Sequence, residues 1–274
     1  MSALRAIPRP HEVPPRRQLE APFTTFATML QSNLRRLEEL QIKLPPWLYL
    51  ATPYERKDQS KLSALERERF LCAIDTLIQN GEYGKLVEIH AGMYMQHTNE
   101  RLLPWHRIFL LQLEVRLRAI HPDVSIPFWD WTQPNEQGIP AWLQNVKPTV
   151  TTPTGTITVI RSPGSQQDLA MIVSNMPNIL QMTDFDSFAA SINGVHGSIH
   201  GWVGGTMSGV ATAAADPIFY MHHANLDRIW WKWHTSPQGQ GKNPPLVGAD
   251  AVMDPWAYTE PETRDIAALG YSYA

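Results

Sequence analysis

The sequence predicts a mainly α-helical protein with long loops and minor β elements. Apolar residues recur at helical spacing in several segments of ten or more residues, which is the pattern of amphipathic helices. Helix start and stop signals bound most of these segments. The 274 residues include ten tryptophans and 23 prolines, and these counts indicate compact helices joined by rigid, aromatic loops.

The first expected helices are defined by periodicity and by their end signals. Residues 22–44 have helical periodicity and stop before a Pro-Pro pair. The next helix opens at Ser63, where Glu66 three residues later completes a capping box, and it stops at Gly81. A shorter helix is expected over residues 85–95.

The second half of the chain alternates helices with irregular segments. A helix is expected over residues 104–120, with its proline in the first turn, where the missing N–H costs nothing. Residues 123–138 form an aromatic loop, and residues 149–164 alternate around a Pro-Thr-Gly turn, which predicts a small hairpin. Further helices are expected over residues 184–202 and 216–234, the last opening with an Asp-Pro pair that matches an N-cap and first turn.

Composition excludes several classes of function. The formal net charge is −3, charged residues make up 18% of the chain and there is no basic block, so nucleic acid is not an expected partner. No apolar run is long enough to span a bilayer, so no membrane association is expected. The N-terminal residues lack the apolar core of a secretory signal, which predicts a cytoplasmic protein, with a mature secreted form as the alternative. The single cysteine, Cys72, cannot form an internal disulfide and is expected on a buried helix face.

The length suits one large domain, with two small domains as the alternative. We expect a single domain over residues 1–274 in which residues 1–50 form an N-terminal extension, a Pro/Arg-rich arm followed by a helix. This amphipathic helix is expected to pack on the domain or on a second subunit, so a homo-oligomer formed through the extension is one expectation.

Histidines carry the strongest chemical signal in the sequence. His90, His97 and His106 lie close together in the chain, and His196 and His200 are four residues apart, so both can face one side of a helix. A lone pair of this kind is as often two polar surface residues as a metal site. Here the neighbours are mostly apolar residues and glycines, which favours metal binding.

Two further histidines belong to the last expected helix. His222 and His223 are adjacent, and His223 falls in line with the apolar face of its helix, as His106 does in its own helix. Helical phase alone does not decide which of the pair joins His196 and His200. Two groups of three histidines without cysteine suit copper, zinc or nickel, and three ligands leave an open position for catalysis or gas binding. The residues therefore predict a dinuclear, all-histidine metal centre inside a helix bundle.

The motifs resemble those of type 3 copper proteins, the family of tyrosinases, catechol oxidases and hemocyanins. The segment HTNERLLPWHRIFLLQLE resembles the signature of the first copper site, and HGSIHGWVGGTMS followed by DPIFYMHHANLDRIWWKW resembles that of the second. IPFWDWT and the C-terminal LGYSYA resemble an aromatic loop and a tyrosine motif of the same family. The resemblance implies a central antiparallel four-helix bundle, two copper ions, O2 as co-substrate and oxidation of phenols to ortho-quinones.

The resemblance also implies roles for particular residues. Asp227 is expected to orient a ligand imidazole, with a surface acid paired to Arg228 or Lys232 as the alternative. Phe219 is expected to pack over the second copper near the substrate ring, or to be plain core. The implied copper ligands are His90, His97 and His106 for the first ion, and His196, His200 and His223 for the second.

Departures from the family pattern refine this expectation. Met95 stands two residues before His97, where many relatives have the cysteine of a Cys–His thioether, and this favours a bacterial-type member. Gly197 and Gly201 follow the ligand histidines, in the expected substrate pocket, and Gly197 lacks the amide that relatives active on monophenols use with an upstream acid. Asp186 is the nearest candidate for that acid. Catechol oxidation is therefore favoured over monophenol hydroxylation.

Other functions remain open at this level. An ortho-aminophenol oxidase would use the same centre on another arene, and a hemocyanin-like oxygen carrier would use it without catalysis. A zinc hydrolase or a structural metal site is the third alternative. The chain ends at the tyrosine motif, so we expect no C-terminal lid domain and no proteolytic activation, unless another chain or the N-terminal arm covers the site.

Overall fold

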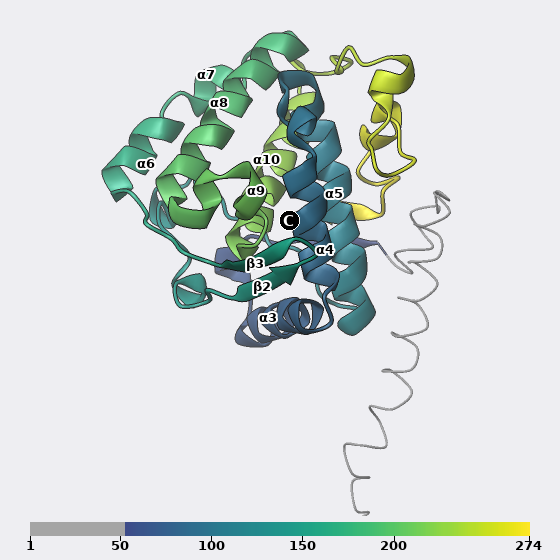
Figure 1. Ribbon diagram of the computed structural model, residues 1–274. Helices are drawn as coiled ribbons and strands as arrows, with labels where there is room; N and C mark the ends of the chain where they lie inside the picture. Colours follow the sequence, from purple (N-terminus) through teal and green to yellow (C-terminus); the bar gives the residue numbers. More distant parts are fainter. Residues whose placement is uncertain (1–52) are drawn as a thin grey trace, which may run out of the picture.

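Four helices form the centre of the computed structural model, which describes residues 53–274 (Figure 1). The expected helix over residues 22–44, and with it the expected N-terminal interface, lies outside the described residues. The central helices each carry at least one histidine of the two candidate groups, and α5 packs against both α8 and α10. They are α4 (Glu82–Gly92), α5 (Asn99–Ile120), α8 (Phe185–Val203) and α10 (Pro217–His234).

Local capping explains where two of the helices begin. Helix α3 (Ala64–Gln79) starts after Ser63, and both hydrogen bonds of the predicted capping box with Glu66 are present. Helix α10 starts after Asp216, whose side chain accepts a hydrogen bond from the N–H of Ile218, as the Asp-Pro pair predicts. These two predictions are confirmed.

The predicted start of α5 is wrong by more than one turn. The helix begins at Asn99 and contains Pro104 in its interior. A proline is most common in the first turn because its missing N–H has no helical partner there. Further inside a helix it removes one hydrogen bond and its ring crowds the carbonyl four residues earlier, at a cost of about 3 kcal/mol. The burial of α5 along almost its whole length offsets the cost of Pro104, since the residues from Leu102 to Leu117 are all buried.

The predicted hairpin is present and supports α4. Strands β2 (Thr149–Thr152) and β3 (Gly155–Thr158) pair antiparallel, and β2 contacts α4. Gly84 makes this contact possible, because a Cβ atom at this position would lie 1.9 Å from the carbonyl oxygen of Thr151. The close approach fixes the helix that carries His90.

A second strand pair joins the two ends of the described chain and was not expected. Strand β1 (Tyr54–Arg56) pairs in parallel with β4 (Tyr271–Tyr273), which contains the C-terminal tyrosine motif. Two short helices beside α8 and one between α8 and α10 were also not predicted. They are α6 (Gln166–Val173), α7 (Met176–Ile179) and α9 (Val210–Ala213).

Tryptophans fill much of the core around the bundle. Trp105, Trp129, Trp131, Trp230 and Trp233 are all fully buried. None of the helices described between residues 53 and 274 is long and apolar enough to cross a membrane.

The environment of the single cysteine corrects a prediction. Cys72 was expected on a buried helix face, but it is exposed on α3. Its neighbours Ala73 and Ile74 are buried instead, so the buried face of α3 lies one position further along.

Candidate metal centre

The histidines named from the sequence meet in two groups inside the bundle. His90, from α4, and His97, from the 3-10 turn Tyr94–His97, join His106 of α5 in the first group. In each group the candidate ligand nitrogens lie within 4.8 Å of one another. The second group contains His196 and His200 of α8 with His222 and His223 of α10.

The two groups face each other across the centre of the bundle. The rings of His106 and His223 stack with their centroids 4.1 Å apart and their planes 10° apart. The rings of His97 and His196 are 6.4 Å apart, and their planes are 23° apart. The two sites would therefore be neighbours, as a dinuclear centre requires.

Hydrogen bonds at Nδ1 determine which ring nitrogen is available to a metal. The Nδ1 atom of His90 lies 2.9 Å from the carbonyl oxygen of Val210, and that of His106 lies 2.8 Å from the carbonyl oxygen of Leu102. His200 Nδ1 lies 2.7 Å from the carbonyl oxygen of Met207. A carbonyl oxygen can only accept, so each Nδ1 carries the proton and each Nε2 keeps its lone pair.

The Nε2 atoms converge at the spacing of ligands on one ion. Those of His90 and His97 are 3.1 Å apart, and those of His200 and His223 are 3.3 Å apart. Two nitrogens bound tetrahedrally at about 2.0–2.1 Å from one ion would be roughly 3.3 Å apart. The Nε2 atoms of His106, His196 and His222 are buried and have no hydrogen-bond partner among the described residues. This is expected of metal ligands, but it does not separate His222 from the others.

Trp131 separates the roles of the two adjacent histidines on α10. Its indole N–H lies 3.1 Å from Nδ1 of His222, and an indole nitrogen can only donate. Nδ1 of His222 is therefore the acceptor, and the neutral ring carries its proton on Nε2, which leaves no lone pair for a metal. Helical phase left this choice open, and the hydrogen bond favours His223 as the ligand.

The imidazoles are held in the neutral form that binds metals. Burial, reinforced by the neighbouring histidines, lowers the pKa of His90, His106, His196 and His223 well below the ordinary value. Burial lowers the pKa of His200 to about 4. No carboxylate belongs to either group in the described part of the chain, and this all-nitrogen donor set fits copper.

Phe219 and two glycines lie beside the histidines on different sides. Phe219 is fully buried, and its ring centroid is 4.7 Å from that of His90 and 4.2 Å from that of His223, so it touches both groups. Gly197 and Gly201 are exposed on α8, and a Cβ atom at either position would meet nothing within 4 Å. The inner wall of the centre is therefore aromatic, and the two glycines place no side chain on the exposed face of α8 next to His196 and His200.

Asp227 has a different environment from the one expected. It is buried, and its carboxylate accepts hydrogen bonds from Arg107, Arg56, Tyr271 and Tyr273. Burial alone would raise the pKa of Asp227, but Arg107 and Arg56 outweigh it and lower that pKa. The carboxylate thus ties α10 to α5 and to the β1–β4 pair. It neither orients an imidazole nor lies on the surface, because both of its oxygens are taken by these four donors.

Sequence reasoning missed two residues that bond the histidines. Trp131 lies in the predicted aromatic loop, but nothing in the sequence points it at His222. Asn193, one turn before His196 on α8, has its Oδ1 3.2 Å from Nδ1 of that histidine. An asparagine inside a helix gives no sequence signal of this kind.

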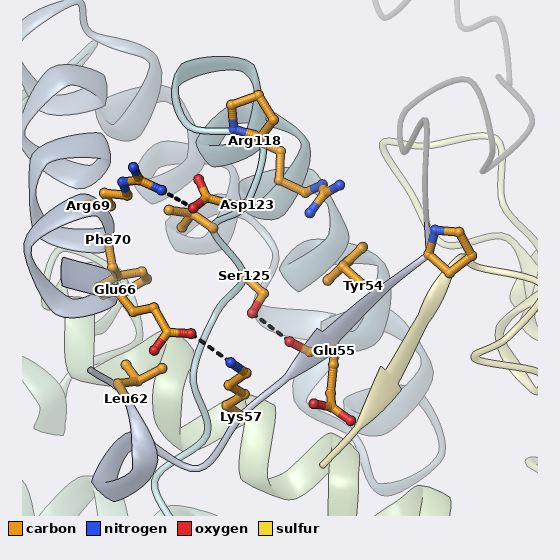
Figure 2. A pocket seen from close by; sticks show the side chains of 13 residues that line it. Tyr54, Glu55, Lys57, Leu62, Glu66, Arg69, Phe70, Arg118, Asp123 and Ser125 are labelled. Atoms are coloured by element: carbon orange, nitrogen blue, oxygen red, sulfur yellow. Dashed lines mark hydrogen bonds and ion pairs between the residues drawn. The ribbon is translucent and has the colours of Figure 1, made fainter. Parts of the chain in front are cut away.

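A separate pocket of about 380 Å³ lies between β1, α3 and the turn after α5 (Figure 2). An ion pair between Lys57 and Glu66 crosses it, with a distance of 2.7 Å between the charged atoms. Arg118 lines the pocket twelve residues after His106, which is about 18 Å along α5. No histidine lines this pocket, so it lies outside the candidate centre.

Comparisons with known proteins agree with this geometry. A family model for the common central domain of tyrosinase matches residues 80–179 and 147–236. The tyrosinase of Streptomyces glaucescens is 27% identical over 257 residues, which cover 75% of this chain and 93% of that protein. A G-type hemocyanin of Enteroctopus dofleini is 28% identical over 211 residues, covering 65% of this chain and 7% of the longer relative.

Solved structures share the fold at lower identity. A functional unit of octopus hemocyanin has a TM-score of 0.68 and 24% identity, covering 80% of this chain and 68% of that chain. The tyrosinase of Burkholderia thailandensis has a TM-score of 0.62 and 18% identity, covering 81% of this chain and 74% of that chain. These structures establish the fold alone, whereas the family model matches more than half of the sequence. The chain therefore belongs to the tyrosinase family of type 3 copper proteins.

Proposed function

We propose that this protein is a polyphenol oxidase that uses O2 to oxidise ortho-diphenols to ortho-quinones. Two diphenols would give up four electrons and four protons to one O2, which leaves as two waters. The observation that carries the proposal is the pair of facing imidazole groups, whose rings meet at His106 and His223 with centroids 4.1 Å apart. The proposed ligands are His90, His97 and His106 for one copper, and His196, His200 and His223 for the other.

The protein would orient the ligand imidazoles, keep them neutral and shield the centre from water. Bound copper would supply the activation of O2 and the electron transfer. Main-chain carbonyls hold the Nδ1 protons of His90, His106 and His200, so each Nε2 is aimed inward before any metal arrives. Burial keeps these rings neutral, and Phe219 fills the space between the groups on the inner side.

Substrate would approach over the exposed face of α8. Gly197 and Gly201 leave open space beside the ligands His196 and His200, so a flat phenol can come close to the centre there. Asp186 was the candidate for an acid that helps to deprotonate a monophenol. It is exposed and lies ten residues before His196, which is about 15 Å along the helix. This distance supports diphenol oxidation over monophenol hydroxylation.

The test is an assay of the copper-loaded protein with a monophenol, a catechol and an ortho-aminophenol. We expect fast quinone formation from the catechol and little product from the monophenol. Faster turnover of the aminophenol would reassign the substrate class. Reversible O2-dependent absorbance without product from any of the three would instead support an oxygen carrier, the second candidate that the hemocyanin relatives favour.

The choice of ligand on α10 has its own test. His223→Ala is expected to bind one copper equivalent instead of two and to lose oxidase activity. His222→Ala is expected to keep both equivalents, because Trp131 holds Nδ1 of His222 and its Nε2 carries the proton. Loss of the second copper in the His222 variant alone would reverse the assignment.

The open α8 face allows the substrate preference to be probed without disturbing the core. Gly197→Asn adds an amide where a Cβ atom meets nothing within 4 Å, and it is expected to raise the ratio of monophenol to catechol turnover. Gly194→Asn is the matched control, since Gly194 is also exposed and unobstructed on α8. An equal effect of both variants would show that position 197 has no special relation to the substrate.

A further inference from the structure

Among the described side chains of α8, that of Asn193 alone forms hydrogen bonds to residues of both histidine groups. Its Nδ2 lies 3.2 Å from the carbonyl oxygen of His97 and 2.9 Å from Oδ1 of Asn99. Its Oδ1 lies 3.2 Å from Nδ1 of His196. A single side chain therefore connects the first group, through the main chain of His97, to a ring of the second group.

The orientation of this amide is fixed by its partners. The carbonyl oxygen of His97 can only accept, so the atom of Asn193 that faces it must be the nitrogen. The amide oxygen then faces Nδ1 of His196, which must carry the ring proton to make the bond. Nε2 of His196 is left with its lone pair, buried and without a partner among the described residues.

His196 differs in this respect from the other ligands whose Nδ1 partner is described. His90, His106 and His200 bond main-chain carbonyls, which are present whatever side chain occupies those positions. Only the partner of His196 is a side chain, so among these four the tautomer of His196 alone depends on the identity of one residue.

The bonds to His97 and Asn99 act on the junction between the 3-10 turn and α5. The N-cap of α5, Thr98, makes no side-chain capping bond within the described chain. The amide of Asn193 instead holds the residues on either side of that cap. The link from His90 to His97 is short, so the position of His97 depends on how this junction is held.

We propose that Asn193 is a positioning residue that couples the two halves of the centre, fixing the tautomer of His196 and the main chain of His97. The inference rests on the proposed function insofar as these histidines bind copper. The amide oxygen of Asn193 fixes the tautomer of His196, and the amide nitrogen holds the main chain of His97. Two substitutions can therefore test the two effects separately.

Asn193→Leu removes both sets of bonds, and Asn193→Asp keeps an acceptor for His196 but places a carboxylate against the oxygens of His97 and Asn99. The first readout is ¹⁵N NMR of the imidazoles in metal-free protein at about pH 8, above the ordinary histidine pKa. Wild type and Asn193→Asp are expected to show His196 protonated at Nδ1. Asn193→Leu is expected to show a mixture of the two tautomers.

The second readout is copper retained in competition with a Cu(I) chelator. Both variants are expected to bind copper about 10–100-fold more weakly than wild type, the usual effect of losing a group that orients a metal ligand. Asn178→Asp is the control, because Asn178 is an exposed asparagine whose side-chain amide donates to Asn175, three residues earlier, and to no other residue of the described part of the chain. It is expected to leave copper affinity and the His196 tautomer unchanged.

Several outcomes would overturn the proposal. An unchanged His196 tautomer in Asn193→Leu would remove the first effect, and wild-type copper affinity in Asn193→Asp would remove the second. If the leucine variant fails to fold, loss of the Nδ1 proton of His196 in the aspartate variant would refute the tautomer claim. Both readouts are independent of turnover, so a protein that binds two coppers but does not oxidise catechols would refute the proposed function and leave this inference standing.

Discussion

Asp227→Asn is expected to lower the free energy of unfolding by about 3–5 kcal/mol, because it removes one partner of a buried ionic network. Asp227 is 3% exposed and sits between the guanidinium groups of Arg56 and Arg107, at 2.9 and 2.5 Å. The hydroxyls of Tyr271 and Tyr273 donate to the same carboxylate at 2.7 and 2.5 Å. An asparagine keeps the shape but leaves the two buried cations with less negative charge and turns an N–H group towards donors.

For a folded unit of this size the loss corresponds to a fall in melting temperature of roughly 6–20 °C. The assay is urea and thermal unfolding of the metal-free variant, followed by the copper content of the molecules that remain folded. Asp123→Asn is the matched control, since Asp123 pairs with Arg69 where their side chains are 54% and 39% exposed. An exposed pair of this kind contributes about 0–1 kcal/mol.

A destabilisation by Asp227→Asn no larger than that of the control would refute the account of the network. Normal stability combined with weak copper binding would instead favour the expectation from the sequence, in which Asp227 acts on a ligand imidazole. The structure predicts the opposite combination. Stability should fall, and the molecules that stay folded should bind copper with an affinity close to that of wild type.

Three other changes have defined outcomes. The free energy of unfolding of the metal-free protein should fall as the pH drops from about 7 towards 4. The pKa of His200 is about 4 in the folded protein and about 6.5 in the unfolded chain, so the unfolded chain binds the proton first. A free energy of unfolding that stays constant from about pH 7 to 5 in urea titrations would contradict this. Gly84→Ala should destabilise the protein by about 1–3 kcal/mol in thermal unfolding, since its Cβ would lie 1.9 Å from the carbonyl oxygen of Thr151. Gly92→Ala on the same helix is the control and should leave the stability unchanged, because its Cβ would meet nothing within 4 Å. Burial raises the pKa of Glu136 to about 6, so Glu136→Gln should stabilise the fold at about pH 8, and urea unfolding should show this advantage shrinking towards about pH 5.

Local patterns in the sequence predicted the parts of the fold that local interactions determine. The capping box at Ser63 and the Asp-Pro start at Asp216 lie within one turn of the backbone groups they bond, so a short window contains all the information. The helices that carry the histidines follow from apolar periodicity in the same way. The start of α5 was misplaced because Pro104 reads locally as a first-turn residue, and only the burial of the whole helix shows how the missing bond is offset.

Contacts between distant residues could not be predicted in this way. Strands β1 and β4 are too short to be recognised singly, and their pairing joins Tyr54 to Tyr271 across almost the whole described chain. The role of Asp227 depends on that pairing, because its partner Arg56 comes from β1 and its partners Tyr271 and Tyr273 come from β4. Without the pairing, an acid four residues after a ligand histidine resembles either a partner of that histidine or a surface residue.

The assignment of His223 over His222 illustrates the same division inside the metal centre. The two residues are adjacent, both are buried, and the pKa of each is lowered first by burial and then by neighbouring histidines. Hydrophobic phase and electrostatics therefore do not separate them. Their ring contacts differ: Nε2 of His223 lies 3.3 Å from Nε2 of His200, whereas Nδ1 of His222 accepts from the indole of Trp131. That indole comes from a loop 91 residues earlier, and its bond places the proton of His222 on the nitrogen that would otherwise bind the metal. The chemistry of the second site thus depends on where that loop docks against α10, and the main-chain bond from Trp129 to Met221, 3.1 Å long, holds the loop there.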